Sequence, residues 1–353
     1  MKKILLLSLI TVSAFTFKAQ ATSMAADTGK AGDPPLTITG SVDAYYKYDF
    51  SGHNNIPTSF ASDHNSFSIG MVDLALKKKV GKASFVGEVS FGPRNDQSIP
   101  VPTNHIQNLY ISYDVTDNFN LTGGYMGTFV GYEVINAAGN FNYSTSYMFT
   151  NGPFQNAGVK ATFLFSDKAS LMVGAFNDQW NVYKAVNNIG LFGAQLMVAP
   201  AEGWTAYINL LTGSNSTATS GTVVDITTAY QMTEAFKLGL NAADYSASNG
   251  AGTGGYQGIA LYPQLAVSSA VTLGLRGEYF KTKTGTFATF GPAPGSSVTA
   301  LTLTANIKSG PLTLIPEVRL DSNKDLATSA FTKGNGMPTK SASQFVLAAV
   351  YSF

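Results

Sequence analysis

The chain has 353 residues, of which 44% are hydrophobic and only 12% are charged, with a formal net charge of +1 and no cysteine. Soluble domains usually carry about 25% charged residues. The high apolar content excludes a disordered chain, the absence of cysteine excludes disulfide scaffolds and Cys-ligated metal sites, and the balanced charge excludes a strongly basic surface for nucleic acid.

The first segment has the layout of a secretory signal peptide. A short basic start, Met1-Lys2-Lys3, precedes a mostly apolar run over 4–17, and Ala19-Gln20-Ala21 supplies small residues for cleavage. An uncleaved anchor is the alternative, but the run is short for a helical span of about 20 residues. We expect residues 1–21 to be a signal peptide, 22–35 a short periplasmic N-terminal segment and 36–353 the folded domain.

A period-two pattern begins at residues 36–50 and recurs along the chain. Apolar residues alternate there with Thr, Ser, Asp and Lys, which places the two sets on opposite faces of a strand. We predict 16 strands, with 14 or 18 as alternatives. In chain order the predicted strands are 36–50, 64–79, 82–92, 104–115, 119–127, 155–165, 169–177, 189–199, 203–212, 221–231, 235–245, 256–267, 271–281, 297–308, 311–321 and 343–353.

The connections between these strands alternate in length, and the long ones are rich in Gly, Ser, Asn, Thr and Pro. Short turns on one side and long loops on the other are typical of a closed transmembrane antiparallel β-barrel, with periplasmic turns and extracellular loops. A soluble β-sandwich is the alternative, but it would leave the apolar face in water. Lipid forbids open sheet edges, so the sheet must close. The predicted long loops are 51–63, 93–103, 128–154, 178–188, 213–220, 246–255, 282–296 and 322–342.

Irregularities are expected within three predicted strands. The alternation in 64–79 changes phase near Met71 to Asp73, which indicates a β-bulge. Pro263 and Pro316 fall on outward-facing positions, and each removes one ladder hydrogen bond. We expect bulges at both prolines.

The final strand carries a pattern that is associated with insertion into the outer membrane. Apolar residues occupy alternate positions and the chain ends on an aromatic residue, a pattern that resembles the recognition signal read by the barrel insertion machinery of the outer membrane. The residues of this insertion signal are Phe345, Leu347, Tyr351 and Phe353. The signal and the strand pattern together predict an integral protein of the outer membrane.

Residues 119–159 carry several short motifs that resemble one family. The motifs are Leu121-Thr122-Gly123-Gly124, the run 127–133, Asn142-Tyr143-Ser144, Gly152-Pro153-Phe154 and Gly158-Val159-Lys160. Together they resemble the putative beta-barrel porin-2 (OmpL-like) family. The resemblance implies an outer-membrane pore and names no solute. The chain departs from the family at Gln155-Asn156-Ala157, where His usually precedes the Gly at position 158.

The inner wall of a 16-stranded barrel would enclose an aqueous channel roughly 30 Å across at the backbone. By strand phase, acidic and basic side chains are mixed on this wall, so we expect no strong ion selectivity from it. The predicted pore-lining residues are Asp43, Lys47, Glu88, Asp114, Lys160, Asp225, Lys237, Arg276, Glu278, Lys308, Glu317 and Arg319.

The loop 128–154 is the longest predicted connection, and loops of this length are usually functional or disordered. We hypothesise that it folds into the barrel and narrows the channel; the alternative is an exposed surface loop. Its predicted constriction residues are Thr128, Tyr132, Glu133, Asn142 and Tyr143.

The sequence therefore predicts a porin, a passive diffusion channel for small hydrophilic solutes. Expected partners are outer-membrane lipid, the insertion machinery, those solutes and further copies of the chain; no catalysis, cofactor, metal or nucleic acid is expected. One alternative is a non-conducting barrel that acts as a surface anchor or adhesin. Another is an outer-membrane hydrolase, for which His53, His64 and His105, with Asp49, Asp63 or Asp96, are the candidate groups.

Overall fold

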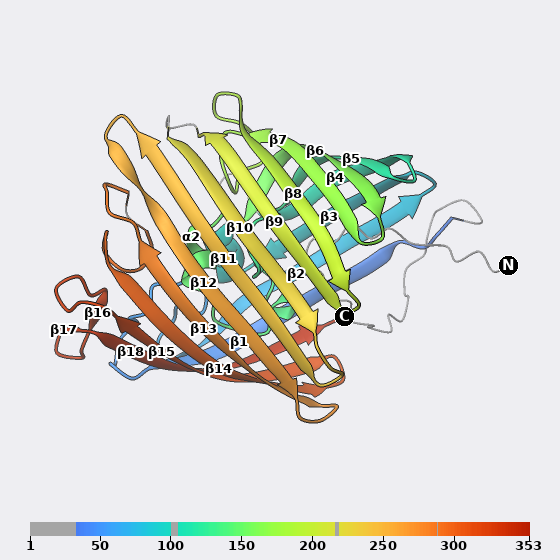
Figure 1. Cartoon of the computed structure of the whole chain (residues 1–353). Coiled ribbons are helices and arrows are strands. Elements are labelled where there is room, and N and C mark those ends of the chain that lie inside the picture. Colours follow the sequence, from blue (N-terminus) through green and yellow to red (C-terminus); the bar gives the residue numbers. More distant parts are fainter. Residues whose placement is uncertain (1–32, 100–104, 216–218, 288) are drawn as a thin grey trace.

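The computed structural model describes residues 33–99, 105–215, 219–287 and 289–353. The predicted signal peptide, residues 1–21, lies outside the described residues. The chain forms a closed barrel of sixteen antiparallel strands, in which each strand pairs with its neighbours along the chain and β1 closes against β18 (Figure 1). The predicted strand number is confirmed. Within the described ranges, no helix is long and apolar enough to cross a membrane.

The barrel strands are β1 (Thr37–Asp49), β2 (Ser66–Val80), β3 (Ala83–Phe91), β4 (Ile106–Thr116), β5 (Phe119–Gly127), β6 (Gln155–Ser166), β7 (Ala169–Asn177), β8 (Ile189–Ala201), β9 (Trp204–Ser214), β10 (Ser220–Gln231), β11 (Phe236–Asn249), β12 (Gly252–Ala266), β13 (Val271–Thr282), β14 (Ser297–Ser309), β15 (Leu312–Asn323) and β18 (Ser341–Ser352). The loops carry α1 (Pro93–Ser98), a 3-10 turn (Ala137–Gly139), α2 (Tyr147–Asn151) and the hairpin β16 (Phe331–Thr332) with β17 (Pro338–Thr339).

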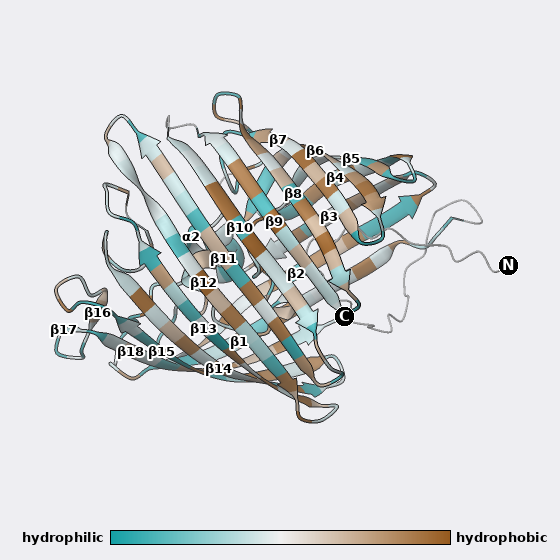
Figure 2. Ribbon diagram, in the orientation of Figure 1, coloured by the Kyte–Doolittle hydropathy of each residue, from teal (hydrophilic) through white to brown (hydrophobic). Residues whose placement is uncertain are grey.

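The two faces of each strand meet different surroundings. On β1, Val42 is 43% exposed on the outer face, whereas Asp43 and Lys47 are buried on the inner face at 6% and 2%. In Figure 2, apolar residues, in brown, alternate with paler and teal residues along the strands. This arrangement is the inverse of a soluble protein and matches a wall between lipid and a polar interior.

The barrel closes through the two ends of the folded chain. The Phe353 amide donates to the Gly40 carbonyl at 3.0 Å, and the Gly40 amide donates back to the Phe353 carbonyl at 3.0 Å. The register then continues along β1 and β18, for example Ala44 opposite Ala349. Closure satisfies the backbone groups of both edge strands, as lipid requires.

Two loop predictions are wrong at the extracellular side. The Gly- and Ser-rich residues 246–255 do not form a long loop, because β11 continues to Asn249 and β12 begins at Gly252. Gly252 and Gly255 have φ values of 153° and 127°, which only glycine adopts easily, so glycine here permits pairing in a distorted hairpin. The predicted loop 213–220 is likewise shortened, since β9 and β10 pair up to Ser214 and Ser220.

The bulge prediction for β2 is confirmed. The β1–β2 register shifts between Val42 and Ala44, opposite residues Ile69 and Val72, so the extra residue lies at the Gly70–Met71 position. One consequence is that the alternation of β2 reverses beyond this point.

The predicted bulges at the two prolines are wrong. Pro263 pairs in register with Leu238, and Pro316 pairs in register with Leu347. On the other side of each proline the ladder lapses for two positions and resumes without a shift. A proline lacks the N–H that would complete those pairs. The neighbouring strand continues alongside it in the same register, without an extra residue.

The interior of the barrel is filled at mid-height by the loop between β5 and β6, which carries α2 behind the front wall in Figure 1. Tyr147 and Met148 of α2 pack with Tyr256 and Phe280 of the wall in an apolar cluster. The core of this protein is thus the contact between an inserted loop and the inner face of the sheet.

Candidate functional site

The loop 128–154 crosses the barrel from one wall to the opposite one. Near its start, the Gly131 amide donates to Asp225 Oδ1 of β10 at 3.0 Å. Further along, the Asn136 side-chain amide donates to Asp73 Oδ1 of β2 at 2.8 Å. β10 and β2 lie eight places apart in the ring of sixteen strands, so they face each other across the lumen.

A buried ion pair fixes the middle of the loop to β13. Arg276 Nη1 lies 2.7 Å from Glu133 Oε1, and Arg276 is fully buried. The same guanidinium donates to the Ser144 carbonyl at 2.6 Å. Glu133 Oε2 accepts from both the amide and the hydroxyl of Ser146, at 2.7 and 2.8 Å. Glu133, predicted to line the constriction, is therefore also the residue that folds the loop back on itself.

Two carboxylates of the wall each receive two successive backbone amides of the loop. Glu317 on β15 accepts from the amides of Tyr143 and Ser144 at 2.9 and 3.1 Å. Glu278 on β13 accepts from the amides of Tyr147 and Met148, both at 3.0 Å. Hydrogen bonds to an ionised carboxylate are stronger than neutral ones, so these four amides anchor the loop without any contribution from its own side chains.

Two loop tyrosines complete the anchoring. The Tyr143 hydroxyl donates to Asp43 Oδ2 at 2.6 Å, and the Tyr147 hydroxyl donates to Asp321 Oδ2 at 2.7 Å. Burial raises the pKa of both phenols well above the usual value, so both remain protonated donors. Arg319 bonds to Asp321 and to the Thr145 carbonyl, at 2.7 and 2.8 Å, and its guanidinium lies 5.2 Å from the Tyr147 ring centroid.

Of the other predicted constriction residues, Tyr132 and Asn142 lie against the inner wall, and Thr128 lies where the loop leaves β5. The Thr128 amide donates to the Phe154 carbonyl at 3.0 Å and joins the two ends of the loop. Tyr132 stacks on Tyr262 of β12 with ring centroids 4.5 Å apart. Asn142 donates to Thr304 of β14 at 2.7 Å.

The remaining predicted pore-lining residues have other neighbours. Lys47 donates to Asn54 of the first extracellular loop, and Glu88 accepts from Asn108 at 2.5 Å. Asp114 pairs with Lys79 at 2.5 Å near the periplasmic end. Three further predicted lysines lie on the inner face by register: Lys160, Lys237 and Lys308.

Sequence reasoning missed two residues of this site. Asp73 is 4% exposed and bonds to Ser41 at 2.5 Å as well as to the loop. It faces inward only because the bulge at Gly70–Met71 reverses the alternation of β2, so counting the phase from the bulge would have found it. Arg94 of α1 donates to the Ile135 carbonyl at 3.1 Å and lies 3.9 Å from Asp43. It comes from an extracellular loop, where no periodic signal exists.

The three histidines bond to neutral groups. His53 contacts the Thr332 hydroxyl, and His64 Nδ1 accepts from the backbone amide of Asp49 at 3.0 Å. His105 Nδ1 lies 3.0 Å from the Ser90 carbonyl. Among the interactions of the described residues, none joins an imidazole to a carboxylate. Within the same described ranges, no group of three His, Cys, Asp or Glu side chains could hold a metal ion.

A closed sixteen-strand barrel with an apolar exterior, a polar interior and an inserted loop is the architecture of the outer-membrane porins. The chain belongs to the putative beta-barrel porin-2, OmpL-like family, whose model matches residues 35–353. The predicted family is confirmed. A search of the curated proteins found no match.

Solved outer-membrane barrels share the fold. The outer membrane channel DcaP of Acinetobacter baumannii is 14% identical, with 94% of this chain and 100% of that chain covered and a TM-score of 0.61. An anion-selective porin from Comamonas acidovorans is 13% identical, with 90% and 99% covered and a TM-score of 0.63. The outer membrane protein OmpT of Vibrio cholerae, in trimer form, is 12% identical, with 90% and 99% covered and a TM-score of 0.58. At these identities the likeness shows the fold alone.

Proposed function

We propose that the protein is a passive diffusion channel of the outer membrane for small hydrophilic solutes, narrowed by the loop 128–154. The observation that supports this most directly is the span of the loop between β10 and β2 inside a polar barrel. A loop anchored at both walls divides the lumen and sets the size of what passes.

The burial of the inner wall suggests where the path runs. Around β13 and β15 the loop packs tightly, since Arg276, Arg319 and Glu278 are 0–2% exposed. On the opposite arc, Glu88 of β3 and Lys160 of β6 are only half-buried. Among the described residues, Lys160 has no bonded partner. The path therefore runs past Glu88 and Lys160, which keep partial contact with water.

Single-channel conductance of the refolded protein in a planar bilayer tests the proposal. Deletion of residues 134–148 removes the anchored part of the loop and should raise the conductance. A deletion of residues 333–337, in the turn of the β16–β17 hairpin, is the matched control and should leave the conductance unchanged. Equal conductance of the 134–148 deletion and the intact protein would contradict the proposal that the loop narrows the channel.

The anchored loop also favours a second candidate, a non-conducting barrel that acts as a surface anchor. Flux of a small uncharged sugar into liposomes separates the two. No flux with the intact protein, together with flux after the 134–148 deletion, would favour the anchor over the pore.

We also propose that the barrel sits in outer-membrane lipid as a homo-oligomer after insertion by the barrel machinery. The apolar outer face supports the lipid contact, and the trimer form of the V. cholerae protein with the same fold supports the oligomer. Chemical cross-linking in native membranes, followed by gel electrophoresis, tests the oligomer: a monomer band alone would contradict it.

A further inference from the structure

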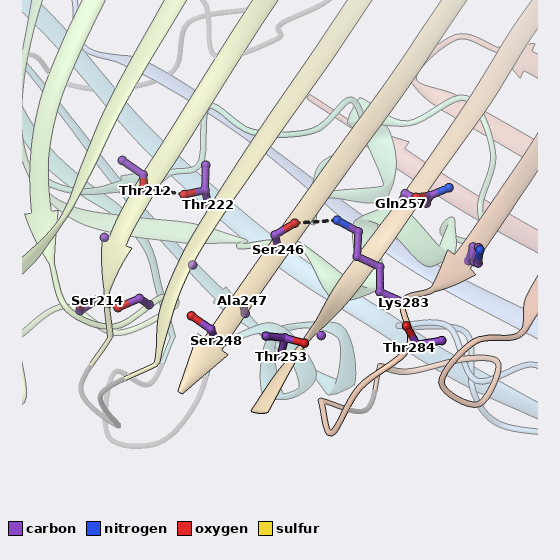
Figure 3. Close-up of a pocket in the computed structure, with 15 residues that line it drawn as sticks. Thr212, Ser214, Thr222, Ser246, Ala247, Ser248, Thr253, Gln257, Lys283 and Thr284 are labelled. Carbon is purple, nitrogen blue, oxygen red and sulfur yellow. Dashed lines mark hydrogen bonds between the residues drawn. The ribbon is translucent and has the colours of Figure 1, made fainter. Parts of the chain in front are cut away.

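A groove of about 710 Å³ lies on the barrel at the extracellular ends of β9 to β13 (Figure 3). Its side chains are mainly Ser and Thr, with Gln257, Lys281 and Lys283 among them. It is separate from the inserted loop and plays no part in the proposed channel.

The strand phase places the groove on the outer surface. Thr222 and Gln257 line it, whereas their neighbours Val223 and Tyr256 point into the barrel and are 0% and 3% exposed in interior clusters. Side chains alternate between the two faces of a strand. The lining side chains therefore face away from the lumen.

This sector of the outer wall differs from the rest of the rim. On β1 to β3 the outer face carries aromatic residues up to the extracellular end, including Phe67 and Phe91. On β9 to β13 the same level carries hydroxyl, amide and ammonium groups, while the next outward positions toward the membrane are apolar, for example Ile259 and Tyr279. Figure 2 shows the change from apolar bands to polar ends along β11 and β12. The groove thus begins directly above the apolar band, at the level of lipid headgroups.

The charged groups at the groove lie on both sides of β12. Lys283 of the loop after β13 reaches across β12 to β11, where its Nζ lies 2.6 Å from Asp244 Oδ1 and 2.7 Å from Ser246 Oγ. It crosses at Gly255, which has no side chain in the way. Lys281, one step nearer the membrane, is half-buried and has no bonded partner among the described residues. Lys281 therefore offers an ammonium group beside Gln257, one row below the hydroxyls of Ser246 and Thr222.

We propose that this groove binds a phosphate-bearing saccharide, with Lys281 on the phosphate and with Gln257 and the Ser and Thr hydroxyls on the sugar. An ammonium group forms charge-assisted bonds with phosphate, and hydroxyl and amide groups match the donors and acceptors of a sugar. The same chemistry is found in the headgroup of a phosphorylated glycolipid of the outer leaflet and in a soluble sugar phosphate. Binding at this groove does not depend on conductance through the barrel.

Titration calorimetry of the detergent-solubilised full chain tests it with three probes: a soluble bisphosphorylated glucosamine disaccharide, its acylated form in mixed micelles, and inorganic phosphate. We expect the saccharide probes to bind and Lys281→Gln to weaken binding by roughly tenfold, the effect of losing one charge-assisted bond. Lys78→Gln, which removes an outward-facing lysine from the other end of the barrel, is the matched control and should bind like the wild type.

The probes distinguish the source of the ligand. Binding of the acylated form alone supports a membrane lipid, and equal binding of the soluble disaccharide supports the headgroup itself. The proposal is overturned if the wild type binds neither saccharide, if inorganic phosphate binds as well as they do, or if Lys281→Gln binds as tightly as the wild type. An equal loss in Lys78→Gln would also overturn it, because bulk charge would then explain the binding. Unchanged conductance of each variant verifies that the barrel is folded.

Discussion

The Tyr143 amide donates to Glu317 Oε2 at 2.9 Å, although the two residues are 174 positions apart in the chain. The neighbouring Ser144 amide occupies the other oxygen of the same carboxylate. One side chain of the barrel wall thus holds two consecutive peptide groups of a loop that has left the wall. This relationship explains why acidic residues occur on the inner face: several of them hold the loop, and they are not free to meet a solute.

Glu317→Gln should loosen the loop. A glutamine has only one acceptor oxygen, so one of the two amides loses its bond and faces an NH₂ group. We expect a loss of about 1–3 kcal/mol in loop anchoring and larger current fluctuations in single-channel recordings. Glu202→Gln, in a periplasmic turn, is the control and should record like the wild type. Identical noise in both variants would contradict the anchoring role.

Arg276→Met should destabilise the folded barrel by about 3–5 kcal/mol, because it leaves Glu133 buried without its partner. Combining Arg276→Met with Glu133→Gln should recover most of that loss, since the neutral glutamine side chain can still accept from Ser146. Guanidinium unfolding of the detergent-folded protein measures both. Simple additivity of the two single changes would show that the ion pair is not coupled.

Asp178 should make the loop 178–188 sensitive to acid. Burial alone would raise the pKa of its carboxyl group, but hydrogen bonds from the amides of Val186, Asn187 and Asn188 lower it below the usual value. A depressed pKa in the folded state means that the stabilisation is complete above the usual Asp pKa and is lost as the pH falls through the lower folded value.

Hydrogen exchange of residues 186–188 between neutral and acidic pH measures this effect. Protection should fall at acidic pH in the wild type. Asp178→Asn should show weak protection at every pH. If protection in the wild type does not change with pH, the Asp178 carboxylate does not hold this loop in place.

Phe353→Ala should impair assembly in cells more than stability in vitro. The backbone of Phe353 closes the barrel through Gly40, and the substitution leaves those two hydrogen bonds in place. Phe353 is 50% exposed, and we expect the insertion machinery to read its ring on the outer face. Heat-modifiability of the protein in outer-membrane fractions should drop several-fold, while refolding in detergent is retained. Phe165→Ala, another exposed outer-face phenylalanine, is the control; an equal assembly defect there would contradict a special role for Phe353.

Most of the barrel could be predicted because its signal is local. Each strand separates lipid from a polar interior, so polar and apolar side chains alternate along it, as along β1. This alternation predicts where a strand lies, which side chains face inward, and its first and last residues to within a few positions. The misses at residues 246–255 and at Pro263 have a common reason: Gly and Pro patterns indicate where regular pairing is strained, and neighbouring strands can accommodate that strain without a loop or a bulge.

The contacts inside the barrel could be identified only from the tertiary structure. The inner-face charges followed from strand phase, but nothing in the sequence showed that Asp43, Glu278 and Glu317 bind one loop, or that Arg94 joins them from another. These contacts link positions far apart in a loop with no periodicity, and only the closed barrel brings them together. The alternation of residue types along each strand therefore determined which face meets lipid and which meets the polar interior. Which charges face each other, and which remain open to solutes, was decided by the path of the loop across the lumen.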